Sequence, residues 1–143
     1  MDPHIHIITL GVADMERSYR FYHEGLGFPT SQGPDDGIVF FQTGGVCLAL
    51  YSFEGLAEDV SPDLPKEKGR FPGFTLAHNT RSREAVDEIL TLVEKAGGTI
   101  EKPAQDVFWG GYSGYFSDPD GYLWEVAYSA DWEFDENGDL MID

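Results

Sequence analysis

A single carboxylate interrupts an otherwise apolar and aromatic run near the end of the chain. Glu125 lies in the segment Tyr122–Tyr128, and the side chains around it are aromatic, aliphatic or small, as is typical of a strand. If Glu125 points into a cavity, it could remove a proton from a substrate as a general base, or bind a cationic or hydrogen-bond-donating group of a ligand. Otherwise it is a structural carboxylate bonded to a nearby tyrosine or histidine, or an ordinary surface acid.

Aromatic residues come shortly before this run. Phe108, Trp109, Tyr112 and Tyr115 are interleaved with glycines. Aromatic walls that carry a few hydroxyl groups are typical of pockets for planar or cationic organic molecules. We therefore expect Trp109, Tyr112 and Tyr115 to contact a ligand. The alternative is that half of this cluster packs inside the fold.

A histidine in another expected strand is a candidate partner for Glu125. Regular alternation over residues 73–79 places His78 on the same face as Phe74 and Leu76, and we expect that face to line the cavity. A histidine next to a carboxylate could exchange protons with it. The alternative is a core histidine with its hydrogen bonds satisfied. Glu125 and His78 are thus the candidate catalytic residues.

The elements that would position these side chains repeat along the chain. A helix from Asp14 to Gly25 and a second helix between Ser82 and Gly97 each follow one strand and precede several more. The order β-α-β-β-β therefore occurs twice and indicates an internal duplication. We expect strands over residues 4–12, 38–42, 46–51, 73–79, 99–102, 112–117 and 122–128, a proline-rich connector without periodicity over 54–72, and a hairpin at Asn137-Gly138.

A turn signal comes directly before the strand of Glu125. Asp118-Pro119-Asp120-Gly121 has proline at the second position and glycine at the fourth of a type I turn. We expect this turn to aim the strand and to take no part in chemistry.

Composition narrows the classes of function. The chain has 143 residues, one cysteine (Cys47) and a formal net charge of -17. The length suits one compact domain or two small modules. The negative charge argues against nucleic-acid and anionic-membrane binding, which both rely on cationic side chains, and it permits attraction of a cationic ligand. No signal peptide and no apolar run of the ~20 residues that cross a membrane is found, so we expect a cytoplasmic protein.

Three sequence features together resemble the vicinal oxygen chelate superfamily, which contains glyoxalase I, extradiol dioxygenases, and fosfomycin and bleomycin resistance proteins. They are the doubled element order, the helix Asp14-Met-Glu-Arg-Ser-Tyr-Arg-Phe-Tyr22 followed by Gly25-Leu-Gly-Phe28, and Asp118-Pro-Asp-Gly-Tyr-Leu-Trp-Glu125. The resemblance implies an α+β fold in which tandem βαβββ modules form curved, mixed half-barrel sheets around a small-molecule site. The modules would span residues 1–53 and 73–128, with the connector 54–72 between them and a tail over 129–143. Modules pair within or between chains in such families, and a homodimer is common.

The chemistry of these families usually rests on a divalent metal held by four inward-facing side chains. The resemblance places the four positions at Ile7, Ala49, Phe74 and Glu125. Glu125 is the one residue of this set with a ligand atom for a metal, and divalent cations need several oxygen or nitrogen ligands. We therefore predict no metal and no other cofactor. The cavity is instead expected to be lined by Ile7, Ala49, Phe74, Thr9 and Tyr51.

The preferred hypothesis is a metal-independent small-molecule-binding protein that takes an aromatic or cationic organic ligand, similar to bleomycin resistance proteins. The alternative is an enzyme, either a glyoxalase-like lyase or isomerase or a dioxygenase, with Glu125 as base or as ligand of a divalent metal. The metal content of the purified protein distinguishes these two hypotheses.

Overall fold

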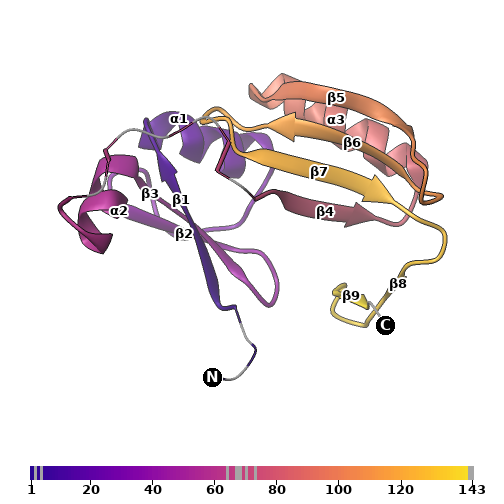
Figure 1. Ribbon diagram of the computed structural model, residues 1–143, viewed down its shortest axis with the longest axis horizontal. Helices are drawn as coiled ribbons and strands as arrows, with labels where there is room; N and C mark the ends of the chain where they lie inside the picture. The colour runs from indigo at the N-terminus through magenta and orange to yellow at the C-terminus, as the bar shows by residue number, and fades with distance from the viewer. Residues whose placement is uncertain are drawn as a thin grey trace. The chain divides into compact units, whose positions relative to one another are not determined.

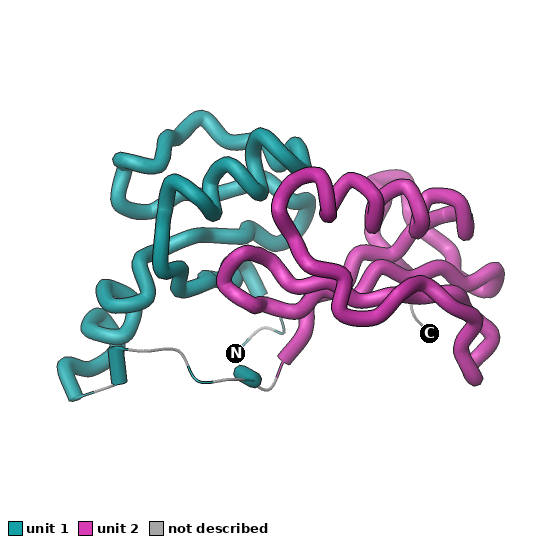
Figure 2. Tube along the Cα trace, turned by 90° about the horizontal axis from the view of Figure 1, so that it is seen from above, with its two compact units in different colours: residues 1–72 teal, residues 73–143 magenta. Residues whose placement is uncertain are grey.

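The computed structural model describes residues 1, 3, 5–63, 65, 66, 69, 71, 72 and 74–141. It divides into two compact units, Met1–Pro72 and Gly73–Asp143 (Figure 2). The expected strand starts at residues 4 and 73 lie outside the described residues. Among the described residues, no helix is long and apolar enough to cross a membrane.

The first unit is a three-stranded sheet with helices. The strands follow the order β1-β3-β2, in which β1 is parallel to β3 and β2 is antiparallel to it (Figure 1). The elements are β1 (Ile7–Val12), α1 (Met15–Tyr19), the π-helix η1 (Arg20–Gly25), β2 (Ile38–Gln42), β3 (Cys47–Ser52) and α2 (Phe53–Val60). Asp14 caps α1 as expected, because its side chain accepts a hydrogen bond from the Arg17 amide at 2.9 Å.

One face of this sheet forms the core of the unit. Leu10, Leu50 and Val39 are lateral neighbours in the register and are fully buried, together with Phe21 and Tyr22 of the helical segment. Because successive strand residues point to opposite faces, the residues between them belong to the other face, on which α2 packs at one end.

The first unit departs from the expected strand pattern between η1 and β2. Residues 28–33 contain no strand, so two strands rather than three follow the helix in this unit's described residues. Pro29 has no N–H to donate, although its carbonyl accepts from the Gln42 amide at 3.0 Å. The side chain of Gln32 bonds to β2 in place of a backbone ladder, accepting from Phe40 N at 2.8 Å and donating to Ile38 O at 3.3 Å.

A helix, α2, also replaces the beginning of the expected connector. Ser52 caps it by accepting from the Gly55 amide at 3.1 Å, and the helix packs against β1 and β3. Phe53 lies so close to Gly11 of β1 that a Cβ on Gly11 would come within 2.7 Å of the Phe53 ring. The absence of a side chain at Gly11 therefore allows α2 to dock.

The second unit is a four-stranded sheet with one face covered by a long helix (Figure 1). Its strands follow the order β4-β7-β6-β5, with β4 parallel to β7 and the other pairs antiparallel. The elements are β4 (Leu76–Thr80), α3 (Arg83–Ala96), β5 (Thr99–Asp106), β6 (Tyr112–Ser117), β7 (Leu123–Tyr128), β8 (Glu133–Phe134) and β9 (Leu140–Met141). The last two strands form the expected tail hairpin.

The helix α3 packs on the face of the sheet that carries Val126. Val86 and Val93 of α3 and Val126 of β7 are all fully buried. Gly114, the β6 neighbour of Val126, lies against α3, because a Cβ there would be 2.8 Å from Leu90 Cδ1. Neither this sheet nor that of the first unit closes on itself, and the protein has an α+β fold with curved, open sheets.

Candidate functional site

Glu125 and Tyr115 are direct cross-strand neighbours on β7 and β6. They alternate with Trp124, Val126 and Gly114, which belong to the face covered by α3, so the pair lies on the open face of the second sheet. Both residues are half-buried. The sheet therefore places one acid and one phenol side by side on this face.

The environment keeps the phenol of Tyr115 neutral. Burial raises its pKa, and the negative charge of Glu125 raises the pKa further. The phenol therefore keeps its O–H as a hydrogen-bond donor at neutral pH.

Small side chains surround this pair. Ala77 of β4 is the lateral neighbour of Glu125, and Ser113 pairs with Ala127 two residues further along the same face. Ser113 and Ala127 are almost fully buried, whereas Ala77 is exposed. Asn79 is the β4 neighbour of Ala127 and adds an amide to this face. This face thus offers the Glu125 carboxylate and the Asn79 amide beside small residues.

His78 does not share the face of Glu125. Its lateral neighbour is Val126, on the α3 side of the sheet, so the expected acid–base pairing of His78 with Glu125 is wrong. The error is one of register: β4 pairs with β7 so that Ala77, and not its neighbour, comes beside Glu125.

Tyr112 also lies on the α3 side. Its hydroxyl donates to Asp87 of α3 at 2.7 Å, and the Arg83 guanidinium lies 4.2 Å from the centre of its ring. Arg83 in turn pairs with Asp106 of β5 at 2.6 Å. The hydrogen bond to Asp87, burial and the charge of Asp87 raise the pKa of Tyr112. Tyr112 thus links the sheet to α3 through this hydrogen bond and does not lie beside Glu125.

The other aromatic candidates of the second unit contact other rings. Trp109, in the loop between β5 and β6, stacks on Trp132 of the tail, with ring centres 5.6 Å apart and planes at 25°. Phe74 lies two residues before β4, with its ring centre 6.1 Å from that of Tyr122. The predicted cluster is therefore divided, and Tyr115 is the aromatic candidate that the structure brings to Glu125.

The candidates of the first unit share one face. Thr9 is the lateral neighbour of Ala49. Ile7 and Tyr51 lie two residues away from them on β1 and β3, on the same face, opposite the core. Ala49 is fully buried, whereas the side chain of Ile7 is 52% exposed. At one end of this face Tyr51 packs against Gly55 of α2, where a Cβ would be 3.0 Å from the phenol ring.

The residues at the four positions do not fit a divalent metal. Ile7, Ala49 and Phe74 have hydrocarbon side chains, and Ala77 beside Glu125 has no ligand atom either. Among the described residues no three side chains of His, Cys, Asp or Glu gather as a metal site would require.

Two further residues were not among the candidates predicted from the sequence. Ser113 lies two residues before Tyr115, so strand alternation alone could have placed it on the same face as the tyrosine. Trp132 lies in the tail, and no sequence pattern indicated that it stacks on Trp109.

The family model of the Glyoxalase/Bleomycin resistance protein/Dioxygenase superfamily matches residues 4–126. The chain belongs to this superfamily. No curated protein sequence matches it.

Solved structures of the superfamily resemble the chain over nearly its whole length. A glyoxalase-related enzyme from Fulvimarina pelagi is 35% identical, with a TM-score of 0.87 and 98% of each chain covered. A glyoxalase/bleomycin resistance protein/dioxygenase from Nocardioides is 26% identical, with a TM-score of 0.71, covering 92% of this chain and 86% of its own. The lactoylglutathione lyase from Agrobacterium tumefaciens is 23% identical, with a TM-score of 0.70, covering 94% and 100%. This last similarity concerns the fold alone.

Proposed function

We propose that this superfamily member binds a small aromatic or cationic organic molecule without a metal, and that Glu125 is the residue that recognises the ligand. The observation that carries the proposal is the half-buried carboxylate of Glu125 on the sheet face opposite α3, beside the neutral phenol of Tyr115. A cationic or hydrogen-bond-donating group of the ligand would bind the carboxylate oxygen atoms that the phenol leaves available.

The composition supports a cationic ligand. The formal net charge of -17 raises the local concentration of cations around the protein and speeds their encounter with it. At the site itself the partly buried Glu125 carboxylate interacts more strongly with a cation than an exposed acid would. The ring of Tyr115 supplies a flat surface for the apolar part of the ligand.

A melting screen tests the proposal. Small cationic aromatic compounds and neutral compounds of the same shape are each added to the wild-type protein, because a ligand that binds the folded state raises the melting temperature. We expect cations to raise it more than their neutral counterparts do, and Glu125→Gln to lose that difference. Glu88→Gln, which neutralises an exposed acid on α3, is the matched control and should keep it. If every compound leaves the wild type unchanged, or Glu125→Gln responds as the wild type does, the proposal is wrong.

An enzymatic function is the second candidate, and the similarity to the glyoxalase-related enzyme favours it. In this alternative Glu125 removes a proton from a hydroxyl-bearing carbon next to a substrate carbonyl and returns it to the carbonyl carbon, while the hydroxyl proton moves to the former carbonyl oxygen. The result is an isomerisation that conserves all atoms. The neutral Tyr115 phenol, in place of His78, would donate a hydrogen bond to the enolate oxygen.

Two measurements separate the candidates. If the protein is an enzyme of this kind, the proton next to the substrate carbonyl should exchange with solvent deuterium in the presence of the wild type but not of Glu125→Gln. NMR follows this exchange. Elemental analysis of protein purified without chelators is the second measurement. A stoichiometric divalent metal would contradict the metal-free binding proposal.

A further inference from the structure

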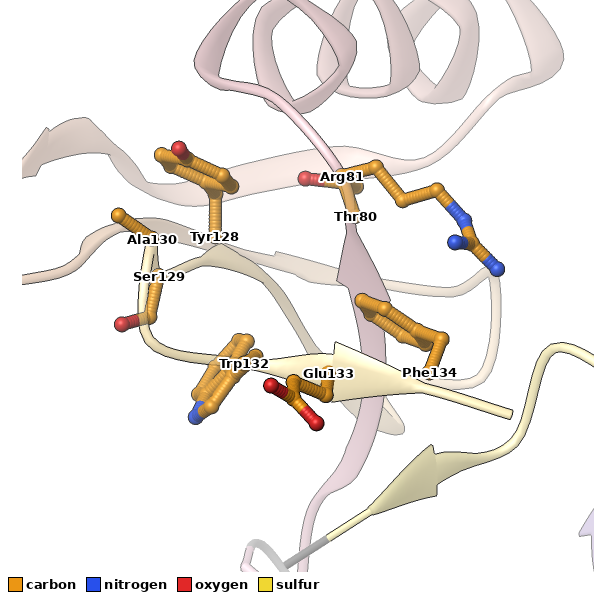
Figure 3. Close-up of a pocket in the computed structure, with 8 residues that line it drawn as sticks. All are labelled: Thr80, Arg81, Tyr128, Ser129, Ala130, Trp132, Glu133 and Phe134. Carbon is orange, nitrogen blue, oxygen red and sulfur yellow. The ribbon is translucent and has the colours of Figure 1, made fainter.

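A pocket that Glu125 does not line lies where two strands of the second sheet end. It has a volume of about 380 Å³ and is lined by Thr80, Arg81, Tyr128, Ser129, Ala130, Trp132, Glu133 and Phe134. Because β4 and β7 are parallel neighbours, both of their carboxyl ends lie at the same edge of the sheet. The tail crosses this edge and supplies the remaining wall (Figure 3). The volume is within the range of small-molecule sites, roughly 300–1,000 Å³.

Three of the residues that line this pocket are aromatic. One of them, Trp132, stacks on Trp109 with ring centres 5.6 Å apart. Tyr128 at the end of β7 and Phe134 on β8 form further walls (Figure 3). An indole fixed by a stacked partner is a rigid platform for a planar ligand.

The positive charge of the pocket comes from Arg81. Its guanidinium lies 4.5 Å from the centre of the Phe134 ring, and it makes no ion pair with the other described side chains. The N–H groups of a guanidinium lie in its own plane. When the guanidinium lies over an aromatic ring, these N–H groups stay available to bind both oxygen atoms of a carboxylate. This distinguishes Arg81 from Arg83, which is already paired with Asp106 at 2.6 Å.

The charges around Arg81 limit the ligand to one negative charge. Glu133 lines the same pocket, and the protein carries a formal net charge of -17. Repulsion from distant acids is screened over about 8 Å at physiological ionic strength, so one nearby guanidinium can still hold a monoanion. A dianion such as a phosphate would meet Glu133 without a second cation to offset it.

We propose that this pocket binds a planar aromatic monocarboxylate, with its ring stacked on Trp132 and its carboxylate paired with Arg81. The site is independent of Glu125, which attracts cations and does not line the pocket. The two sites therefore select ligands of opposite charge.

The test uses the indole N–H signals of the three tryptophans, Trp109, Trp124 and Trp132. Titration with 2-naphthoate should shift the signals of Trp132 and Trp109. The ring of Trp124 stacks on that of Phe116 on the α3 side of the sheet, with ring centres 5.9 Å apart, so the Trp124 signal should not shift. The neutral 2-naphthamide should bind at least about tenfold more weakly, because it lacks the charge-assisted bonds to Arg81.

Variants locate the interaction. Arg81→Gln should bring the Kd of naphthoate to that of the amide, and Arg81→Lys, which keeps the charge and loses the planar fork, should lie between them. Arg20→Gln, which removes a cation paired with Glu16 in the first unit, and Glu125→Gln should both bind naphthoate as the wild type does. Trp132 signals that stay unshifted at about 5 mM naphthoate, equal binding of acid and amide by the wild type, or unchanged binding by Arg81→Gln would each overturn the proposal. So would loss of naphthoate binding in Glu125→Gln.

Discussion

Tyr115 and Glu125 are direct cross-strand neighbours on the second sheet, on the face opposite α3. Burial and the negative charge of Glu125 both raise the pKa of the Tyr115 phenol, so the phenol stays protonated beside the carboxylate.

Because of Tyr115, the free energy of unfolding should depend on pH in the alkaline range. The pKa of Tyr115 is raised in the folded protein above its ordinary value of about 10. Its contribution to stability is therefore fully present below pH 10 and is lost as the pH rises through the folded pKa. Urea unfolding of wild type and Tyr115→Phe from pH 7 to about 11 should show a constant difference in the free energy of unfolding up to pH 10, and a smaller difference above it. A difference that stays constant or grows with pH contradicts the pairing.

The control for this experiment is Tyr112→Phe. The pKa of Tyr112 is also raised, through its hydrogen bond to Asp87 on the other face of the sheet. Its loss should change the alkaline stability as well, but it should leave the ligand response of Glu125 intact.

The turn before β7 should depend on Asp118. Its Oδ1 accepts from the amides of Asp120 and Tyr122, both at 2.9 Å, and the residue is only 4% exposed. Asp118→Ala leaves these donors without their acceptor and should lower the free energy of unfolding by about 2 kcal/mol. Asp118→Asn retains an acceptor oxygen and should cost less. Equal losses in the two variants, measured by urea unfolding, would contradict this role for the side chain.

The docking of α2 should depend on Gly11. A Cβ at this position would lie 2.7 Å from Phe53 Cδ2 and 3.2 Å from Phe53 Cα, so Gly11→Ala should destabilise the protein by about 1–3 kcal/mol. Phe53→Ala removes the ring and with it the closest contact. We expect the double variant to lose less stability than the sum of the single losses, and strictly additive losses in a double-mutant cycle would contradict the contact.

The sequence predicted the elements best where a local signal marks their ends. Ser82 caps α3 by accepting from the Ala85 amide at 3.1 Å, and Gly97 ends the helix with φ 100°. The turn at Asp118 closes through the bond from Gly121 N to Asp118 O at 2.9 Å. Such signals act within a few residues, so one sequence is enough to recognise them.

Features that depend on distant partners were harder to predict. The face of His78 is set by the pairing of β4 with β7, which the mixed side chains of β4 do not specify. Tyr112 and Tyr115 are three residues apart on one strand and so lie on opposite faces, which alternation alone could have revealed. The helix α2 was missed because its docking depends on Gly11, a residue far away in the sequence.

The central claim is that Glu125 binds the ligand through its charge, and calorimetric titration tests it most directly. A cationic aromatic ligand from the melting screen and its neutral counterpart are each titrated into wild type and Glu125→Gln. We predict that the cation binds the wild type at least about tenfold more tightly than the neutral compound, and that Glu125→Gln removes this preference while still binding both weakly. An undiminished preference for the cation in Glu125→Gln would show that the carboxylate does not recognise the ligand.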